Sequence, residues 1–376
     1  MKTALIHDWL PFMGGAERVL TNFLELYPNS PVYTTICNRE RLDGPLKDAD
    51  IRVSSLQKGK KNIENHRKLF PFMPTAMENF DLNEYDVVLS SSSSVAKGVI
   101  TNPNTMHMCY CHSPMRYGWE FSYEYASKMA GGSKIKNKVL GYFLSGMRLW
   151  DNVSADRVDY FIANSENVAR RIWKHYRRES VVIHPPVRCG LFKPSEVDED
   201  YFLILSRLQE YKRIDVAIEA FNKSGLPLVI IGDGPDRDKL EKMANSNVKF
   251  LGRQPDEVIK DYYAKCRGFI FPGEEDFGIT PLEAQASGRP VVAYAKGGAL
   301  ETVIADVTGV FFEEQTEESL NKAIKRFETM NFDKNEIRKH AEKFDESIFK
   351  SKIDTYVNKC YMEFKEEKHW EVIRGE

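Results

Sequence analysis

With 376 residues, of which 42% are hydrophobic and 29% charged, the chain is long enough for two α/β domains, and its composition is that of a globular rather than a disordered protein. Its net charge of −2 argues against a role in binding nucleic acid. The opening MKTALIHDWLPF lacks the charged start and long apolar core of a signal peptide. No stretch approaches the roughly 18 uninterrupted apolar residues of a membrane-spanning helix, so we expect a cytoplasmic protein.

Cysteines and charges add two further expectations. The six cysteines form no C-x-x-C pair and no metal-ligand spacing with histidine, which indicates reduced thiols. Residues 1–190 carry about six net positive charges and the rest about eight net negative. Basic residues gather in 57–68 and 131–150, and the second stretch also holds Leu140, Tyr142, Phe143, Leu144 and Trp150. This pattern fits peripheral binding to an anionic membrane, and it equally fits a solvated helix with a buried apolar face.

The first half of the chain predicts strands in TALIHDW, SPVYTTI, YDVVLSSSS, TMHMCYCH and DYFIANS, with AERVLTNFLELY as the first crossover helix. Longer insertions interrupt this half. The stretch 183–196 holds three prolines and a glycine, which break both helix and strand, so we expect the interdomain hinge there. Two domains imply a cleft between them.

From residue 200 onward, short apolar runs alternate with helix-like stretches. The runs are YFLILS (201–206), PLVIIG (227–232), VKFLG (248–252), GFIFP (268–272) and PVVAYA (290–295). Continuous apolar runs of this length predict strands buried on both faces, and their strict alternation with helices predicts a parallel, doubly wound Rossmann-like sheet. Beyond about residue 314 the chain is predicted to be helical and highly charged.

An unusual string follows the strand GFIFP. In GEEDFGITPLEAQASGRPVV, Glu275 lies in the expected loop and Glu283, eight residues later, on the helix that follows. Ligands bind open parallel sheets at the carboxyl ends of their strands, and a helix N-terminus favours an anion there. An acid in a first helical turn is common by itself, because it complements the helix dipole. The whole string is far more specific.

This string resembles the signature of glycosyltransferase family 4, retaining enzymes of the GT-B fold. SRLQEYKRID resembles the family's clamp for the donor diphosphate, and IGDGP and FLGRQP resemble family loops, the second against the nucleotide base. HDWLPFMGGAERVL resembles the opening of family 4 enzymes that elongate bacterial surface polysaccharides. YCHSPMRYGWE (110–120) resembles a motif of O-antigen mannosyltransferases.

The resemblance implies an α/β fold with two Rossmann-like doubly wound domains facing a cleft. Residues 1–187 would form the acceptor domain, 188–345 the donor domain, and 346–376 C-terminal helices that cross back to the first domain. It assigns catalytic roles to Glu275, His112, Arg207 and Lys212, with His112 near the transferred sugar, donating to a hydroxyl. It assigns acceptor binding to Arg116 and Tyr117, and donor binding to Gly14, Gly15, Arg207, Lys212, Gly232, Gly252, Arg253, Phe277, Gly278, Ile279, Thr280 and Glu283.

Two positions depart from the family pattern. Asp276 stands where many relatives have glycine, and Ser90–Ser94 contains no histidine. Either difference could change the sugar or the acceptor, and neither touches the phosphate clamp. Asp8 and Lys97 also follow predicted strands, but we assign no role to them.

The resemblance implies transfer with retention, in which Arg207 and Lys212 stabilise the departing diphosphate, Glu275 orients the sugar, and neither a metal nor another cofactor is required. No side chain is placed as a covalent nucleophile, so front-face attack is favoured over a two-carboxylate scheme. The nucleotide-sugar donor is best interpreted as GDP-mannose, with UDP- or dTDP-sugars as alternatives. The acceptor would be a saccharide, lipid-linked at the inner face of the membrane.

Other classes of protein remain open. A nucleotide-sugar epimerase or a sugar phosphorylase shares this architecture, and so does a non-catalytic subunit that binds sugar nucleotides. An NAD-dependent oxidoreductase is poorly supported, because no G-x-G-x-x-G follows the first predicted strand.

Overall fold

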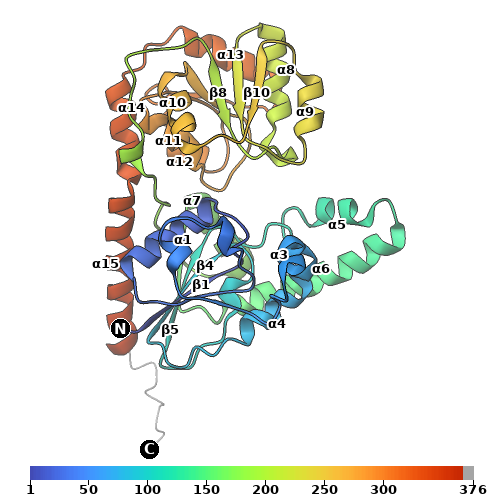
Figure 1. Cartoon of the computed structure of the whole chain (residues 1–376), viewed down its shortest axis with the longest axis vertical. Coiled ribbons are helices and arrows are strands. Elements are labelled where there is room, and N and C mark those ends of the chain that lie inside the picture. Colours follow the sequence, from blue (N-terminus) through green and yellow to red (C-terminus); the bar gives the residue numbers. More distant parts are fainter. Residues whose placement is uncertain (367–376) are drawn as a thin grey trace, which may run out of the picture. The chain divides into compact units, whose positions relative to one another are not determined.

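The computed structural model describes residues 1–366, without the side chains of Lys60, Glu64, Arg67 and Lys128 (Figure 1). Residues 367–376, the end of the predicted C-terminal helical segment, lie outside the described residues. The chain divides into two compact units. Unit 1 comprises Met1–His184 and the chain from Lys350 onward, and unit 2 comprises Pro185–Phe349.

Unit 1 is built on a seven-stranded sheet in the order β3-β2-β1-β4-β5-β6-β7. All neighbouring strands in it are parallel. The strands are β1 (Thr3–His7), β2 (Val32–Thr34), β3 (Ile51–Val53), β4 (Val87–Ser92), β5 (Met106–Cys111), β6 (Tyr160–Ala163) and β7 (Val181–Val182). The central strands β1, β4 and β5 are buried along their whole length, as their apolar and small residues require.

The helices of unit 1 are α1 (Gly15–Leu26), α2 (Gly44–Asp48), α3 (Lys60–Glu64), α4 (Met73–Glu78), α5 (Ser122–Ala130), α6 (Lys134–Ala155) and α7 (Glu166–Tyr176). Ser133 and Ser165 cap the N-termini of α6 and α7 with their side-chain oxygens. From Lys350 onward the long helix α15 (Glu346–Glu366) belongs to unit 1, where Lys350 pairs with Glu25 of α1. The expectation that the C-terminal helix returns to the first domain is therefore confirmed.

Unit 2 contains a six-stranded parallel sheet in the order β10-β9-β8-β11-β12-β13. The strands are β8 (Phe202–Leu205), β9 (Leu228–Ile231), β10 (Val248–Gly252), β11 (Gly268–Phe271), β12 (Val291–Tyr294) and β13 (Gly309–Phe312). The helices are α8 (Ile214–Ser224), α9 (Arg237–Met243), α10 (Asp256–Lys265), α11 (Ile279–Ala286), α12 (Ala299–Thr302), α13 (Glu317–Glu328) and α14 (Lys334–Ala341).

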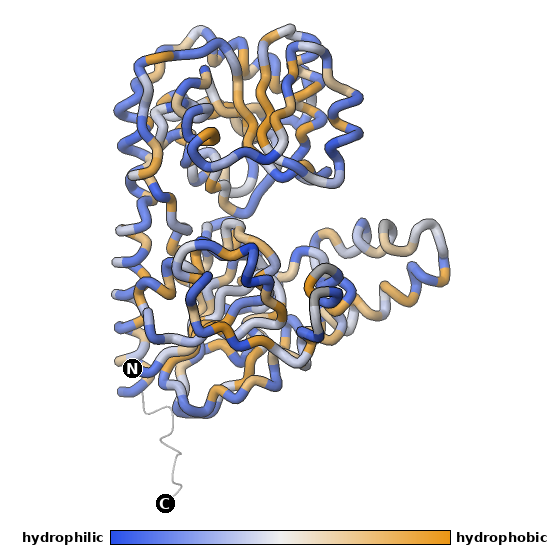
Figure 2. Tube along the Cα trace, in the orientation of Figure 1, coloured by the Kyte–Doolittle hydropathy of each residue, from blue (hydrophilic) through white to orange (hydrophobic). Residues whose placement is uncertain are grey.

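Both units confirm the predicted α/β class with two doubly wound parallel sheets. Hydrophobic residues fill the strands of each sheet and the helix faces that cover them (Figure 2). The strands β3, β7 and β13 lie outside the predicted set. β3 and β7 are only three and two residues long, too short to show a distinct apolar run. β13, with the sequence GVFF, is as long as most of the predicted strands of unit 2, but it lies just before the region that was predicted to be helical.

All six cysteines lie within the described residues, unpaired and buried. Burial raises the pKa of Cys109 and Cys266 to about 12. These thiols therefore behave as small apolar side chains of the two cores.

A buried ion pair joins α6 to the sheet of unit 1. Lys97 lies in the short 3₁₀ helix η3 (Ala96–Gly98) that follows β4, and its Nζ is 2.6 Å from Oδ1 of Asp151 and 3.0 Å from Oγ of Ser154. The other carboxylate oxygen of Asp151 accepts hydrogen bonds from Trp119 and Tyr176. Lys97 is thus a structural cation, a role that its position after a strand did not reveal.

We expect Lys97→Met to lower the free energy of unfolding by about 3–5 kcal/mol, because it leaves the charge of Asp151 buried without its partner. Urea titration followed by circular dichroism measures this loss. Lys2→Met is the matched control, since Lys2 pairs with Glu84 at the surface of the same unit and should cost less than about 1 kcal/mol. Equal small losses in the two variants would contradict the structural role of Lys97.

Candidate functional site

The strand order of each sheet defines where a ligand can bind. In unit 1 the order reverses between β1 and β4, and in unit 2 between β8 and β11. On the two sides of such a reversal, the crossover helices pack on opposite faces of the sheet. The loops at the carboxyl ends of the two strands therefore diverge and leave a crevice between them. A ligand of either unit is therefore expected to contact the loops that follow these two strand pairs.

In unit 2, the loops after β8 and β11 meet through an ion pair. Nζ of Lys212, in the 3₁₀ helix η5 (Glu210–Lys212), lies 2.5 Å from Oε1 of Glu275. Burial alone would lower the pKa of Lys212, but the charge of Glu275 and its hydrogen bond outweigh this effect, and the pKa is raised. Lys212 is therefore a cation held at the strand-order reversal. Arg207 lies on the same loop, with an exposed side chain.

The remaining residues of the DFGITPLE string have different environments. Phe277 is buried in the core of unit 2 and contacts Phe344, so only its backbone faces the loop. Gly278 is the N-cap of α11, and Ile279 and Thr280 form the first, partly exposed turn. Glu283 lies one turn further and is buried, with Oε2 accepting a hydrogen bond of 3.0 Å from the hydroxyl of Tyr263.

Close backbone approaches shape this edge of unit 2. Gly232, directly after β9, has φ of +133°, and a Cβ there would lie 1.9 Å from the carbonyl oxygen of Ser206. A Cβ at Gly298 would lie 2.2 Å from Cα of Phe277. Its amide donates to the carbonyl of Glu275 at 2.9 Å. Only glycine fits at either position. Gly298 was not predicted as a site residue, although its signal, a glycine pair after an apolar run, is visible in the sequence.

The other predicted donor residues follow two further strands, β10 of unit 2 and β1 of unit 1. Gly252 ends β10, and Arg253, which follows it, is exposed. In unit 1, Gly14 is the N-cap of α1 and Gly15 its first residue, so both lie where the loop after β1 enters the helix. All four therefore lie at carboxyl edges of the sheets, as predicted for loops that approach a ligand.

His112 is the first residue after β5 and lies beside the strand-order reversal of unit 1. Its Nε2 lies 2.8 Å from the hydroxyl oxygen of Ser91, and the side chain is partly exposed. Burial and the nearby His7 lower the pKa of His112 to about 3. Its imidazole is therefore neutral at physiological pH. Asp8, close by, accepts hydrogen bonds of 2.7 Å from the amides of Val95 and Ala96, which gives it a structural role at the start of η3.

The two predicted acceptor residues have polar partners in unit 1. Nε of Arg116 lies 3.9 Å from Oε2 of Glu120, and its guanidinium lies over the ring of Phe121. The hydroxyl of Tyr117 forms a hydrogen bond with Ser94, and its ring contacts Phe70 edge-on. Burial raises the pKa of Tyr117 well above its usual value, so its phenol stays protonated.

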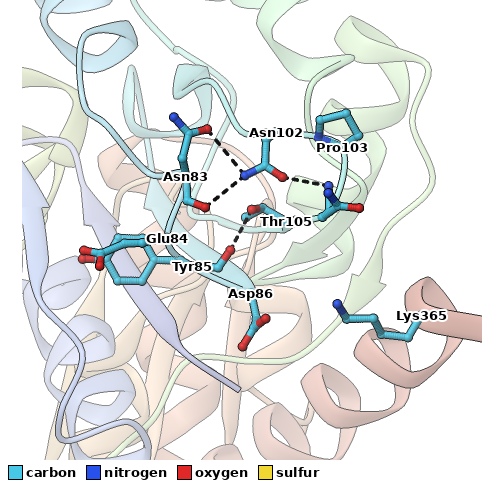
Figure 3. Close-up of a pocket in the computed structure, with 9 residues that line it drawn as sticks. Asn83, Glu84, Tyr85, Asp86, Asn102, Pro103, Thr105 and Lys365 are labelled. Carbon is cyan, nitrogen blue, oxygen red and sulfur yellow. Dashed lines mark hydrogen bonds between the residues drawn. The ribbon is translucent and has the colours of Figure 1, made fainter.

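A hollow of about 320 Å³ lies elsewhere in unit 1 (Figure 3). Its walls come from the segments before β4 and β5, with Lys365 of α15 beside them. Within it, Nδ2 of Asn102 donates to the carbonyl of Asn83, and Thr105 donates to the carbonyl of Tyr85. The hollow is therefore at the amino ends of the strands, away from the crevice of the strand-order reversal.

Two compact units, each built on a doubly wound parallel sheet, are the architecture of the GT-B fold. Residues 13–190 match the model of "Glycosyltransferase Family 4", and residues 192–346 match that of "Glycosyl transferases group 1". Together these two matches extend over nearly the whole described chain. The protein belongs to glycosyltransferase family 4.

Individual relatives share less than a third of their residues with the chain in the matched regions. O-antigen chain mannosyltransferase C of Escherichia coli is 29% identical over 226 residues, which are 54% of this chain and 60% of that protein. An uncharacterized glycosyltransferase of Methanocaldococcus jannaschii is 24% identical over a match that spans 54% of its length. The chain thus spans between half and two thirds of the length of these relatives.

Solved structures resemble the whole chain in fold. HepE of Anabaena, in a crystal structure with UDP, has a TM-score of 0.67 at 19% identity, with 96% of this chain and 100% of that chain covered. Sucrose-phosphate synthase of Thermosynechococcus elongatus has a TM-score of 0.71 at 16% identity, with the same coverage of both chains. At these identities the likeness establishes the fold.

We expect the protein to lose stability as the pH falls from about 6.5 toward 5. Burial lowers the pKa of His107 to about 4 and that of His112 to about 3, whereas both titrate near 6.5 in the unfolded chain. In this range the unfolded chain binds protons that the folded chain does not, so the free energy of unfolding falls by up to about 1.4 kcal/mol per pH unit for each histidine.

Urea titrations at several pH values measure this slope. His107→Gln should unfold with a shallower dependence on pH than the wild type, since one of the histidines with a lowered pKa is gone. The same slope in both proteins would show that His107 titrates normally in the folded state.

Proposed function

We propose that the protein is a retaining glycosyltransferase that moves a hexose from a nucleotide-diphosphate sugar to a saccharide acceptor. The observation that carries this proposal is the Lys212–Glu275 pair at the strand-order reversal of unit 2. It combines a fixed cation and a carboxylate in the loops where a parallel sheet binds ligands.

The chemistry follows from these groups. As the glycosidic bond to the diphosphate breaks, negative charge grows on the leaving phosphate, and Lys212 and Arg207 would stabilise it, together with the N-terminus of α11. Glu275 would accept hydrogen bonds from the sugar and orient it. The departing phosphate would take the proton of the acceptor hydroxyl on the same face, so that the anomeric configuration is retained. These residues supply the charge stabilisation without a metal ion.

GDP-mannose is the donor that we favour. Its support is the likeness to an O-antigen chain mannosyltransferase at 29% identity and the YCHSPMRY segment of unit 1. A UDP-sugar is the alternative, since HepE was crystallised with UDP, and a dTDP-sugar would use the same cations. The acceptor would be a lipid-linked saccharide of bacterial surface polysaccharide synthesis, with Arg116 and Tyr117 on the acceptor side.

Two other functions would use the same donor residues. A nucleotide-sugar epimerase would convert the sugar without an acceptor, and a non-catalytic subunit would bind the nucleotide without releasing it from the sugar. Release of free nucleoside diphosphate only when a saccharide acceptor is present separates transfer from both.

The exposed face of helix α6 supports peripheral binding to an anionic membrane surface. No helix within residues 1–366 has the length and apolar character to cross a membrane. With α5, α6 forms a hairpin that extends beyond the other helices of unit 1 (Figure 1), and hydrophobic residues recur along it (Figure 2). Leu144 and Met147 face the core, whereas a second apolar stripe is exposed, with Ile135 79%, Val139 63%, Tyr142 71% and Leu149 68% accessible.

Charge fits the same surface. The exposed residues Lys134, Lys136 and Lys138 flank the apolar stripe, and no acidic residue occurs between 134 and 150. An apolar stripe bordered by lysines is typical of helices that lie in the plane of an anionic membrane. The other basic stretch, 57–68, includes three side chains outside the described residues and contributes nothing to this proposal.

We expect GDP or UDP to raise the melting temperature, because a ligand that binds only the folded state stabilises it. Lys212→Met should abolish that shift and lower the rate of transfer by a factor of about 10²–10³, the usual loss when one group that stabilises developing charge is removed. Lys223→Met is the control, since Lys223 forms a surface ion pair with Glu317 and should change neither quantity. If none of GDP, UDP and dTDP raised the melting temperature of the wild type, the donor proposal would be wrong.

We expect the protein to sediment with vesicles that contain anionic lipid and much less with neutral vesicles. Replacing Lys134, Lys136 and Lys138 by glutamine should weaken this binding by roughly 10²-fold, since each lysine near the surface contributes about 1 kcal/mol. The matched control replaces the exposed Lys239, Lys242 and Lys325 of unit 2, which should leave binding unchanged. Equal partitioning into both kinds of vesicle would rule out the electrostatic attraction.

A further inference from the structure

Four polar residues of unit 1 form a chain of contacts that ends at His112. His7 is the last residue of β1, Ser91 lies in β4, and His112 follows β5, while Glu17 lies in the first turn of α1. The strands β1, β4 and β5 are neighbours in the sheet, and His7 and Ser91 are direct partners in the register. The sheet order thus brings together residues far apart in the sequence.

The distances are those of hydrogen bonds and a close ion-pair contact. Oγ of Ser91 lies 3.1 Å from Nδ1 of His7 and 2.8 Å from Nε2 of His112. On the other side of the His7 ring, Nε2 lies 3.5 Å from Oε1 of Glu17. His7, Glu17 and Ser91 are buried. A Cβ at Gly14 would lie 2.9 Å from Oε2 of Glu17, so Gly14 also leaves room for this carboxylate.

The available hydrogens fix the direction of the hydrogen bonds in this chain of contacts. The hydroxyl of Ser91 has one hydrogen and two ring nitrogens beside it, so it donates to one ring and accepts from the other. The carboxylate of Glu17 only accepts, which favours a proton on Nε2 of His7. Nδ1 of His7 then accepts from Ser91, and Ser91 accepts from Nε2–H of His112.

The imidazole of His112, at the end of this chain of contacts, carries a single N–H. Burial and His7 lower the pKa of His112 to about 3, so its imidazole is neutral and has a single N–H. With that hydrogen on Nε2, Nδ1 has a free lone pair. Among the described residues, no hydrogen bond occupies Nδ1 of His112, whose side chain is partly exposed.

We propose that Glu17, His7 and Ser91 are positioning residues that hold His112 as its Nε2–H tautomer, so that Nδ1 accepts a hydrogen bond from a hydroxyl of the bound saccharide. The contact with saccharide rests on the proposed glycosyltransferase function. The family resemblance implies the opposite direction, with His112 donating to the sugar. The chain of contacts instead makes His112 select for a hydroxyl that can donate.

This direction has a consequence for substrate choice. A site built to accept from a hydroxyl rejects the analogue that lacks it, since the acceptor atom then stays without a partner. Fluorine in place of that hydroxyl can at most accept a hydrogen bond. A deoxyfluoro sugar therefore offers His112 nothing more than a deoxy sugar does.

The first test is nitrogen NMR of the full chain labelled with ¹⁵N-histidine, with the His112 signals assigned by their loss in His112→Gln. We expect Nε2 of His112 to be protonated and Nδ1 not. A proton on Nδ1 of His112, which a doubly protonated His7 would require, overturns the proposal.

Ser91→Ala should release His112 into a mixture of tautomers. Ser90→Ala is the matched control, because Ser90 makes the corresponding contact to Nε2 of His107 and should leave His112 unchanged. An unchanged tautomer of His112 in Ser91→Ala also overturns the proposal.

The second test uses transfer from donors in which each sugar hydroxyl in turn is replaced by hydrogen or by fluorine. At the position that contacts His112, we expect both analogues to lose kcat/KM to the same extent in the wild type, and Ser91→Ala to reduce the difference between the parent sugar and its deoxy analogue. Recovery of kcat/KM by the fluoro analogue would mean that His112 donates, and would overturn the proposal. The NMR measurement does not depend on sugar transfer. If His112 had the predicted tautomer but the protein showed no transferase activity, only the proposed function would be refuted.

Discussion

The reversal of strand order in two parallel sheets is the constraint on which the rest of the molecule depends. In unit 1 it places the ends of β1 and β4 side by side, and in unit 2 the ends of β8 and β11. Crossover helices on opposite faces keep backbone out of the space between these ends. Lys212 and Glu275 meet in one such place, and His7, Ser91 and His112 in the other. The same topology therefore produces two candidate sites in one chain, one with a lysine–glutamate pair and one with two histidines linked by a serine.

Close packing of the loops fixes the backbone around the candidate site of unit 2. The loops after β8 and β9 touch backbone to backbone at Gly232, and those after β11 and β12 touch at Gly298. Contacts of this kind have no side chains whose rotamers could adjust, and the amide of Gly298 also donates to the carbonyl of Glu275. Both restrict the position of the Glu275 backbone. Preorganisation of this sort is what stabilisation of developing charge requires, because the groups need not reorganise as the charge appears.

Local patterns made much of this predictable. Short apolar runs identify nearly all the longer strands, and the positions that follow them predict Lys212, Glu275 and His112 as site residues. The structure places all three at the carboxyl ends of strands. The structural role of Lys97 and the contacts of Ser91 escaped prediction, because each depends on a partner more than twenty residues away. A lysine after a strand looks the same whether it faces a ligand or a buried aspartate, and a serine in a strand shows nothing of which side chain its hydroxyl contacts. Long-range pairing of single polar residues leaves no period in the sequence.

The burial of every cysteine has a practical consequence. Reaction with alkylating reagents needs a thiolate that solvent can reach, and neither condition is met while the chain is folded. Labelling of the native thiols would therefore report opening of the cores, with cysteines of both units as separate reporters. One cysteine engineered at the surface would be the sole fast-reacting position, so a fluorophore or spin label could be attached there without first removing any of the native six.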